Sequence, residues 1–418
     1  MKKVFSEYLR KQQFQLRSIS AKPKPNLGLV VVIPVHNEPN ILPTLEALAA
    51  CHAPNCSIEV LLMINASEIV EKSILEQNEA ALANFEQFKA NYYGNIDFYA
   101  IVNNQLPKKH AGVGLARKIG MDEAINRFSM IENECGVIVC FDADCTCEPN
   151  YLTEIENHFD KNPSHSACSI HFEHPLKGEE FQPNIYEYIT DYELHLRVYK
   201  NAMNWCGLPY ALHTVGSSMA VKAIDYCKQG GMNRRKAGED FYFLQKFIQL
   251  GNVGELTTTT VFPSPRVSDR VPFGTGRAIG ERMSSNNSEL HSYSILSFEV
   301  ISQVVKKIPE LYANTDLVTT LPHAILDFYT ISKLREVIDA AKRESTNYLN
   351  FEKRFYRFFD AFQVLKLVHY LRDHHFSNEP IQKVAKDLLI KLNNSSISES
   401  NLELLHTFRM IDLKVELI

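Results

Sequence analysis

Val137-Ile138-Val139-Cys140-Phe141-Asp142-Ala143-Asp144 is an apolar run that ends abruptly in two carboxylates. The apolar part predicts a buried strand. Residues two apart on a strand point to the same side, so we expect Asp142 and Asp144 to present paired oxygens at the strand's carboxyl end. Buried carboxylates are unfavourable unless a cation or several hydrogen bonds compensate them. The segment therefore predicts a site for a divalent cation that carries a diphosphate.

Apolar runs alternate with helical patterns on the amino-terminal side of this segment. We expect strands at residues 27–35, 58–64 and 96–102, and helices at residues 40–51, 73–91 and 115–128. This alternation is typical of a doubly wound α/β fold, in which a mostly parallel sheet is flanked by helices. Residues 151–261 show a mixed pattern, which includes a second pair of acids at Glu239 and Asp240.

The carboxyl-terminal third of the sequence has a different character. Apolar residues recur there at helical spacing, as in the series Phe355, Phe358, Phe359, Phe362 and Leu365. This spacing predicts packed amphipathic helices. We therefore divide the chain into a polar lead-in at residues 1–26, an α/β domain at residues 27–280 and an α-helical region at residues 281–418.

The composition is that of an ordinary globular protein, with 418 residues of which 45% are hydrophobic and 22% charged. The formal net charge of −5 lacks the basic excess of nucleic-acid-binding proteins, so we expect no nucleic-acid partner. No apolar run approaches the roughly 20 residues that span a bilayer, and the polar and basic start does not predict a signal peptide. Nine cysteines without a CxxC pair suit a reducing compartment, and we expect a cytoplasmic protein.

Polar residues follow the first two predicted strands, at the edge where open α/β sheets bind ligands. Pro34 is expected to stop the ladder of the first strand, and His36, Asn37 and Glu38 are expected to contact a nucleotide. A helix cap around Asn37 and Glu38 explains the same residues. Asn65, at the end of the second strand, carries the same two interpretations.

Basic residues and two glycines precede the helix predicted at residues 115–128. Gly112 and Gly114 open a helix amino terminus, where backbone amides and the helix dipole favour an anion such as a diphosphate. The segment is neither the phosphate loop GxxxxGK(S/T) nor a complete dinucleotide fingerprint. Lys108 and Lys109 are of a type that usually lies solvated at the surface. Arg117, inside the helix, is therefore the candidate for phosphate contact.

Four motifs together carry a resemblance to a known family. They are PVHNE at residues 34–38, GVGLARKIGMDEA at 112–124, FDADC at 141–145 and GEDFYFL at 238–244. In this order they resemble a soluble, bacterial-type family 2 glycosyltransferase with the GT-A fold, over about residues 27–280. The resemblance implies an enzyme that transfers a sugar from a nucleoside diphosphate sugar to an acceptor hydroxyl of a glycan or glycoconjugate. It also implies inversion at the anomeric carbon and the use of Mg²⁺ or Mn²⁺.

The resemblance further implies roles for the two acid pairs. Asp142 contacts the ribose or the metal, and Asp144 holds the metal. Asp240 matches the second acid of the family's ED motif and is expected to act as the general base. Glu239 contacts the acceptor or the donor sugar, or it favours a helix amino terminus. A turn that merely ends the strand would also explain Asp142 and Asp144.

Other chemistries fit these residues less well. A hydrolase needs a separate acid beside the leaving oxygen, and metal binding already accounts for one acid pair. Several cysteines and histidines suggest zinc, but their spacing matches no common zinc module. These residues are Cys140, Cys145, Cys147, His171 and His174.

Two further segments are candidates for substrate contact. Gly216 and Ser217 would let a donor or acceptor sugar approach the backbone closely, while His213 before them is of the buried, hydrogen-bonded type. Arg270 and Arg277 belong to a glycine-containing loop that is suited to close over a diphosphate, although surface arginines also make local ion pairs.

Several alternatives about function and partners stay open. Trp205 is the single tryptophan, so the QxxRW motif of processive membrane-bound synthases is absent. The helical third supplies core, an oligomer contact or a surface that docks near a membrane-bound acceptor. A sugar nucleotidyltransferase is a second enzyme class, but it would need a glycine-rich loop where PVHNE stands. A non-catalytic nucleotide-sugar-binding protein on the same fold would bind a donor without transferring it.

Overall fold

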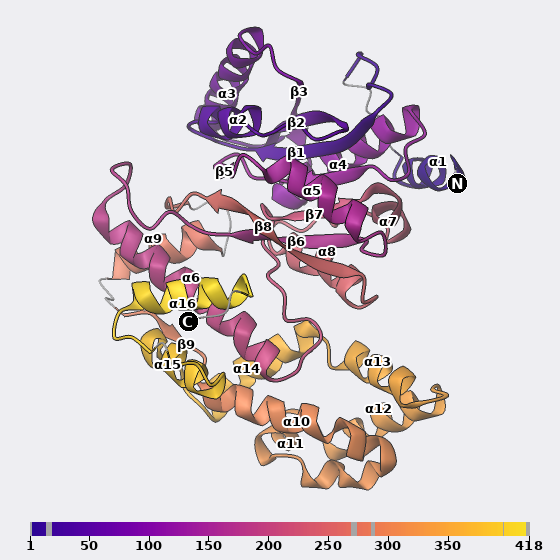
Figure 1. Cartoon of the computed structure of the whole chain (residues 1–418), viewed down its shortest axis with the longest axis vertical. Helices are drawn as coiled ribbons and strands as arrows, with labels where there is room; N and C mark the ends of the chain where they lie inside the picture. Colours follow the sequence, from indigo (N-terminus) through magenta and orange to yellow (C-terminus); the bar gives the residue numbers. More distant parts are fainter. Residues whose placement is uncertain (1, 14–18, 269–273, 286–288, 396, 415–418) are drawn as a thin grey trace. The chain divides into compact units, whose positions relative to one another are not determined.

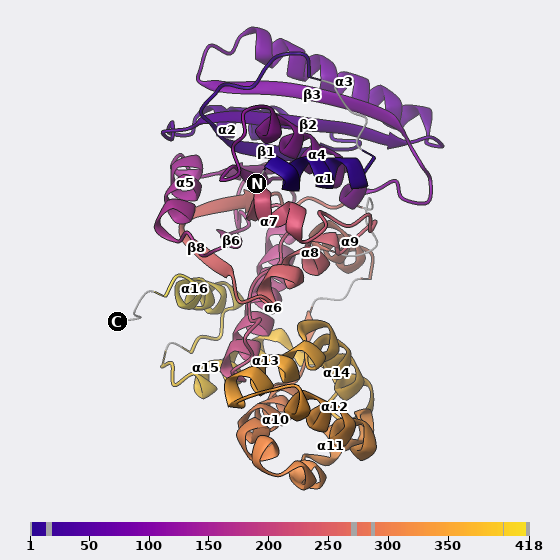
Figure 2. The same ribbon diagram turned by 90° about the vertical axis from the view of Figure 1, so that its right-hand side faces the viewer.

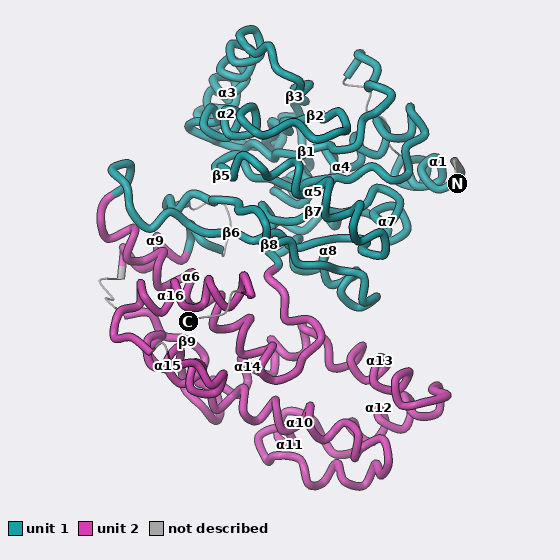
Figure 3. Tube along the Cα trace, in the orientation of Figure 1, with its two compact units in different colours: residues 1–181, 214–277 teal, residues 182–213, 278–418 magenta. Residues whose placement is uncertain are grey.

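The chain forms two compact units (Figure 1, Figure 3). The computed structural model describes residues 2–13, 19–268, 274–285, 289–395 and 397–414. The first unit comprises residues 1–181 and 214–277, and the second comprises residues 182–213 and 278–418. Helix α6 (Pro183–Trp205) belongs to the second unit, although its sequence lies between two segments of the first. The three sequence regions, divided after residues 26 and 280, stay a prediction about domains.

A mixed sheet of eight strands lies in the first unit, in the order β3-β2-β1-β4-β7-β6-β8-β5. Four of the seven strand pairings in this sheet are parallel. Strand β7 runs antiparallel to both of its neighbours, so it separates the parallel group β3-β2-β1-β4 from the remaining strands. The strands are β1 (Leu27–Val35), β2 (Ser57–Ser67), β3 (Ile96–Leu106), β4 (Val137–Cys140), β5 (Cys145–Cys147), β6 (Ala167–Phe172), β7 (Met219–Lys222) and β8 (Val253–Pro263).

Helices connect these strands and cover the sheet. In Figure 2, α3 lies against one side of β2 and β3, and α4 lies on the other side. A Cβ atom at Gly120 would lie 2.5 Å from Val32 Cγ1, so this glycine allows α4 to approach β1 closely. The helices of the first unit are α1 (Lys2–Lys11), α2 (Leu42–Ala49), α3 (Lys72–Ala90), α4 (Val113–Met130), α5 (Tyr151–Lys161), α7 (Ala223–Lys228) and α8 (Glu239–Ile248), and α9 (Thr275–Ser285) crosses into the second.

The predicted fold class is confirmed, because a mostly parallel sheet flanked by helices precedes a helical region. The expectation that Pro34 stops the ladder was wrong, since Pro34 pairs with Met63 and β1 continues to Val35. Alternate residues of a strand bond to opposite neighbours. Val32 bonds on the β4 side, where it accepts a hydrogen bond from Phe141 N. Pro34 faces the same side, past the end of the pairing with β4, so its missing N–H breaks no ladder bond.

The segment at residues 137–144 is shorter as a strand than its apolar pattern suggests. Strand β4 ends at Cys140, and Asp142, Ala143 and Asp144 lie in a turn in which Cys145 N donates to Asp142 O at 3.2 Å. The two acids are therefore not held by strand alternation, and that part of the prediction was wrong. The turn is supported from α2, because the buried Thr44 hydroxyl lies 2.9 Å from Ala143 O and 2.8 Å from Cys145 O.

The polar lead-in contributes a helix to the first unit. Tyr8 of α1 is buried, and its hydroxyl donates to Asp122 of α4 at 2.6 Å. Tyr226 donates to the same carboxylate oxygen at 2.8 Å, and Lys118 pairs with the other oxygen at 2.9 Å. This buried network is satisfied on all sides and joins α1 and α7 to α4.

The second unit is a set of packed helices with a short two-stranded ribbon. Phe355 and Phe359, from the series at helical spacing, are buried in it. Among the described helices, none combines the length and apolar content needed to cross a bilayer. Besides α6, its elements are β9 (His291–Ser292), α10 (Ile295–Ala313), η1 (Thr315–Thr320), α11 (His323–Phe328), α12 (Ile331–Arg343), α13 (Tyr348–Phe358), α14 (Ala361–His374), β10 (Glu379–Pro380), α15 (Ile381–Lys391) and α16 (Asn401–Asp412).

Candidate functional site

Acidic side chains gather around two arginines at the carboxyl ends of the parallel strands. Asp142 and Asp144 lie in the turn after β4, and each pairs with a different arginine. Arg117 of α4 binds Asp142, and Arg266, which follows β8, binds Asp144. This is the edge at which open α/β sheets bind their ligands. We call this group, with Glu38, Glu239 and Asp240, the carboxylate edge.

Arg117 links the two acid pairs that the sequence singled out. Its Nη2 donates to Asp142 Oδ1 at 2.6 Å, and its Nη1 donates to Glu239 Oε1. The side chain is 1% exposed. Burial alone would lower the pKa of Arg117, but the Asp142 and Glu239 carboxylates outweigh it and raise the pKa. Arg117 is thus a permanently charged bridge between carboxylates, and its predicted contact with phosphate stays a prediction.

Arg266 makes a second bridge, between one acid that follows β1 and another that follows β4. Its Nε donates to Asp144 Oδ2 at 2.9 Å, and its Nη2 donates to Glu38 Oε2 at 2.5 Å. Strand pairing brings it there, because β5 pairs with the end of β8 and sets Cys145 opposite Pro263. Ser264 N also donates to Asp144 O at 3.2 Å.

Sequence reasoning selected the later arginines of this loop and passed over Arg266. Its position directly after a strand, where ligand-binding residues concentrate, is the signal that would have found it. Arg270 lies outside the described residues. Arg277 lies in the first turn of α9 and is half-buried. The proposed roles of both residues at a diphosphate are not tested by these observations.

Asp240 has the electrostatic character of a proton acceptor. It is half-buried in the first turn of α8, directly after Glu239. Burial, followed by the charge of Glu239, raises the pKa of Asp240 to about 7. Its Oδ1 accepts a hydrogen bond from Phe241 N at 2.7 Å. A carboxyl group whose pKa lies near neutral pH can exchange protons during a reaction, which is what general base catalysis requires.

Glu239 points into the protein and binds Arg117. It is 3% exposed, and burial raises its pKa above the ordinary value, against the opposing charge of Arg117. A buried acid with an arginine partner orients its surroundings. The geometry therefore favours Glu239 as a support for Asp142 and Asp240, while contact with a sugar stays a prediction.

Gly216 packs directly against this cluster. A Cβ atom at residue 216 would lie 2.8 Å from Arg117 Nη1 and 3.1 Å from Asp240 Oδ2. The glycine therefore lets the backbone touch the guanidinium and the candidate base at once. Ser217, beside it, is buried, with its hydroxyl 3.4 Å from that of Ser218. The predicted close approach of a donor or acceptor sugar to the backbone at Gly216 and Ser217 stays a prediction.

The polar residues after β1 and β2 are tied to one another. His36 Nδ1 donates to Asn65 O at 2.9 Å, and Asn65 Nδ2 donates to Val35 O and Met63 O. Asn37 has a φ of 49°, in the left-handed region that Asn tolerates, and its N–H donates to Asn78 Oδ1 at 3.0 Å. No side-chain cap forms at the start of α2, where Ile41 is the cap residue. Neither Asn37 nor Glu38 therefore caps α2, and the capping interpretation of these two residues was wrong.

Asn78 is a positioning residue that sequence reasoning missed. It is buried on α3, and its Nδ2 donates to Asn65 O at 2.9 Å and to Asn104 Oδ1 at 3.3 Å. With its bond to Asn37, this single amide joins the ends of β1, β2 and β3. A polar residue on the otherwise apolar side of a predicted helix is a weak signal, because many such residues are simply solvated.

Gly112 and Gly114, at the amino terminus of α4, allow close packing there. A Cβ at Gly114 would lie 2.2 Å from Arg235 O, and a Cβ at Gly112 would lie 3.1 Å from Lys236 Cα. The amino terminus of α4 thus contacts the segment that leads into α8. Lys108 and Lys109 are exposed, as their residue type suggested. Binding of a diphosphate at this terminus stays a prediction.

Of the cysteines that suggested zinc, Cys145 lies beside the turn of the acids, with its Sγ 3.9 Å from Asp144 Oδ1. His213 belongs to the second unit and pairs with Asp412 at 3.2 Å. Burial raises the pKa of the Cys140 thiol to about 12, which holds it in the neutral form that binds metals poorly. Within the described ranges, no three His, Cys, Asp or Glu side chains gather closely enough to be a metal-binding group.

The chemistry of the carboxylate edge fits a hard divalent cation. Among the residues that the structure describes, the ion pairs of Arg117 and Arg266 bring together four carboxylates, which belong to Glu38, Asp142, Asp144 and Glu239. Mg²⁺ is commonly held by one or two carboxylates together with substrate phosphates and water. Asp142 and Asp144, which lie two residues apart in one turn and are partly exposed, are suited to be those carboxylates.

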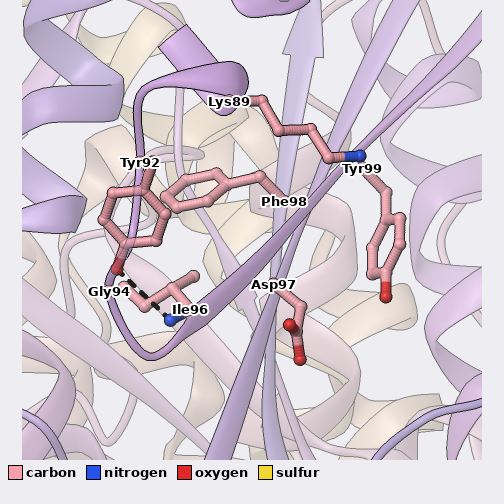
Figure 4. A pocket seen from close by; sticks show the side chains of 7 residues that line it. All are labelled: Lys89, Tyr92, Gly94, Ile96, Asp97, Phe98 and Tyr99. Carbon is pink, nitrogen blue, oxygen red and sulfur yellow. Dashed lines mark hydrogen bonds between the residues drawn. The ribbon is translucent and has the colours of Figure 1, made fainter.

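A cavity of about 220 Å³ lies at the amino half of the edge strand β3 (Figure 4). Its lining includes Tyr92 and Phe98 on one side of the strand, and Asp97 and Tyr99, which alternate with Phe98 and face the other side. The cavity therefore has lining residues on both sides of β3, which is an edge strand of the sheet. It lies at the opposite ends of the strands from the carboxylate edge, and no acid pair borders it.

The family model "Glycosyl transferase family 2" matches residues 30–214. No curated protein matches the sequence. A structure of S. aureus TarS residues 1–349 with UDP-GlcNAc shares 12% identity over 79% of this chain and 90% of that chain, with a TM-score of 0.41. The mannosyltransferase PcManGT from Pyrobaculum calidifontis, in complex with GDP-Man and Mn²⁺, shares 13% identity over 98% and 95%, with a TM-score of 0.35.

Both structural likenesses are low in identity and in TM-score, so the fold assignment depends on the sheet described above. The family model covers three of the four motifs, from PVHNE to FDADC. The resemblance that the motifs carried is confirmed over residues 30–214, and this chain therefore contains a family 2 glycosyltransferase domain.

Proposed function

We propose that this glycosyltransferase is metal-dependent and inverting, and that it moves a sugar from a nucleoside diphosphate sugar to a hydroxyl of a glycan or glycoconjugate. The observation that carries the proposal is the Arg117 bridge. It joins the turn that bears Asp142 and Asp144 to the helix that begins with Glu239 and Asp240. Through this bridge, Asp142 and Asp144, which are suited to the donor, keep a fixed distance from Asp240, which is suited to the acceptor.

The donor diphosphate is proposed to lie at the carboxylate edge. Asp142 and Asp144 would hold Mg²⁺ or Mn²⁺, which would neutralise charge on the departing diphosphate. Asp142 would also contact the ribose. Pro34, His36, Asn37, Glu38 and Asn65 are proposed to shape the nucleotide side of the site, and Arg117 to supply positive charge beneath it. Arg270 and Arg277 are proposed to contact the diphosphate from the loop after β8.

Asp240 is proposed to be the general base. Its carboxylate takes the proton of the acceptor hydroxyl while that oxygen forms a bond to the anomeric carbon. The bond from this carbon to the diphosphate oxygen breaks on the opposite face, and the electron pair leaves with the diphosphate. Attack opposite to the leaving group inverts the anomeric configuration. Glu239 holds the local geometry through Arg117, and Gly216 and Ser217 are proposed to border the sugar.

A thermal-shift panel tests the donor part of the proposal. Purified protein is heated with each common nucleoside diphosphate and nucleoside diphosphate sugar, with and without Mn²⁺. We expect one nucleotide base to raise the melting temperature, and Mn²⁺ to increase the shift, because a ligand that binds only the folded state stabilises it. The stabilising donor is then given to candidate acceptors, and the anomeric configuration of the product is read by NMR.

Three results distinguish the alternatives. Stabilisation without transfer or slow donor hydrolysis would favour a non-catalytic binding protein. Release of pyrophosphate from a nucleoside triphosphate and a sugar phosphate would favour a nucleotidyltransferase. A product that retains the anomeric configuration would contradict the role of Asp240. Peripheral association with a membrane, self-association and a cytoplasmic location remain proposals that this panel does not address.

A further inference from the structure

The two arginines of the carboxylate edge differ in how firmly they are held. Arg117 is 1% exposed, lies within a helix and contacts two acids, and the backbone of Gly216 packs against it. Arg266 is 16% exposed and lies outside helix and strand, after the end of β8. Both arginines nevertheless occupy an oxygen of an acid that the proposed function assigns to a divalent cation.

We propose that Arg266 competes with the divalent cation for Asp144. In the form described, the guanidinium of Arg266 bonds Asp144 Oδ2 at 2.9 Å and places a positive charge beside this acid. A cation bound to Asp144 replaces that charge, and two cations on one carboxylate repel each other. Arg266 therefore releases Asp144 when the cation binds. It keeps a second anchor in Glu38, a buried acid to which its other nitrogen donates.

This competition has a consequence for the order of binding. Arg266 weakens the binding of the metal alone, because the cation must first displace a charge-assisted hydrogen bond. A metal that arrives with a diphosphate brings oxygens to which the released guanidinium can donate, so the displaced bond is replaced. The inference rests on the proposed function, and it makes Arg266 a positioning residue that acts through Asp144.

The test is Mn²⁺ binding in the absence of nucleotide, followed by the electron paramagnetic resonance signal of free Mn²⁺. We expect Arg266→Gln to bind Mn²⁺ at least about tenfold more tightly than the unaltered protein, because a unit charge within several Å of a cation is removed. We expect Arg266→Lys to fall between the two. A residue that only supports the local structure would instead leave the affinity unchanged or weaken it.

Two further variants keep the test decisive. Arg266→Gln leaves the buried Glu38 without this arginine, so Glu38→Gln/Arg266→Gln removes that acid as well and should still bind Mn²⁺ more tightly. Asp144→Asn in the Arg266→Gln background should abolish the gain. Arg335→Gln, which breaks an exposed pair with Asp316 in the second unit, is the matched control and should not change the affinity.

Unchanged or weaker Mn²⁺ binding in both Arg266→Gln and the double variant, with melting curves that show folded protein, overturns the inference. Absence of Mn²⁺ binding in every variant overturns it as well. In that second case, transfer measured with EDTA separates the two failures. Activity that survives EDTA contradicts only the metal part of the proposed function, whereas absence of transfer with every donor, with Mn²⁺ as well as with EDTA, contradicts the function itself.

Discussion

A cluster of arginine and carboxylate lies in each compact unit, and the two clusters differ in their exposure to solvent. In the second unit, Arg197, Lys200 and Arg409 face the acids Glu193 and Asp412, and all five side chains are buried. At the carboxylate edge of the first unit, Arg117 and Arg266 are bound to Asp142 and Asp144, and these two acids and Asp240 are partly exposed.

The difference appears in the pKa values of the acids. Burial alone would raise the pKa of Asp412, but His213, Arg197 and Lys200 lower it well below its usual range. Burial and a neighbouring acid raise the pKa of Asp240 to about 7. A fully buried cluster holds its charges fixed, which suits a structural role. A partly exposed cluster can be reached by a ligand and by protons, which suits a site.

The largest expected effect is at Asp240. We expect Asp240→Asn to lower kcat for transfer by about 10²–10⁴-fold, because the amide cannot accept the acceptor's proton. Nucleotide binding, measured by calorimetry, should be retained. Asp225→Asn, which alters an acid paired with Lys228 on α7, is the control and should keep its activity. Retention of full transfer by Asp240→Asn would remove this residue from the mechanism.

The second cluster should affect stability instead. Asp412→Ala leaves Arg197 and Lys200 without their shared acid, and we expect the free energy of unfolding of the second unit to fall by about 3–5 kcal/mol. Trp205, the single tryptophan, lies in this unit, so its fluorescence during urea denaturation reports the change. Asp144→Asn is the comparison, and a loss of similar size there would contradict the distinction between the clusters.

A smaller effect is expected at Gly216. A methyl group at this position must displace Arg117 or Asp240, and overpacking of this kind typically costs about 1–3 kcal/mol. We expect Gly216→Ala to lower kcat/KM for transfer by roughly ten- to a hundredfold, since the displaced groups position the acceptor base. Gly251→Ala is unsuitable as a control because its φ is 73°. Ala47→Gly on α2 serves as the control instead, because Ala47 does not belong to the carboxylate edge.

The smallest effect is the pH dependence of transfer. Protonated Asp240 cannot act as a base, so kcat/KM should fall about tenfold for each pH unit below the pKa of about 7 and should level off above it. Activity falls as the pH is lowered because the deprotonated form of Asp240 is the active one. The raised pKa places this fall near neutral pH. A profile that is flat from pH 5 to pH 9 would show that no group with this pKa limits the reaction.

Sequence patterns predicted most of the parallel half of the fold. The range 27–35 is identical to β1, and the helix predicted at 115–128 lies inside α4. Local apolar periodicity accounts for this agreement, because it records which side of an element is buried. The end of β4 was not predictable in the same way. Phe141 is fully buried and continues the apolar pattern, which therefore predicts strand at this residue. A turn nevertheless begins directly after it.

The candidate site was predicted in part. Asp142, Asp144 and Asp240 were chosen from motifs and spacing, and the structure brings the first two to one turn and links Asp142 to the third through Arg117 and Glu239. Arg266 and Asn78 were missed, since an arginine in a loop or an amide on a helix has no distinctive pattern. Their importance comes from partners that lie far away in the sequence.

The sequence by itself determined the alternation of strands and helices, the acids that follow those strands and the resemblance to family 2 glycosyltransferases, which the family model matches over residues 30–214. These are local properties, because each depends on neighbouring residues or on a short motif. Only the tertiary structure decided which arginine meets which acid. Arg117 and Glu239 lie 122 positions apart, and Arg266 and Glu38 lie 228 positions apart. Such pairs form where β5 meets β8 and where α4 meets α8, and the order of strands in the sheet, which no local pattern records, sets those meetings.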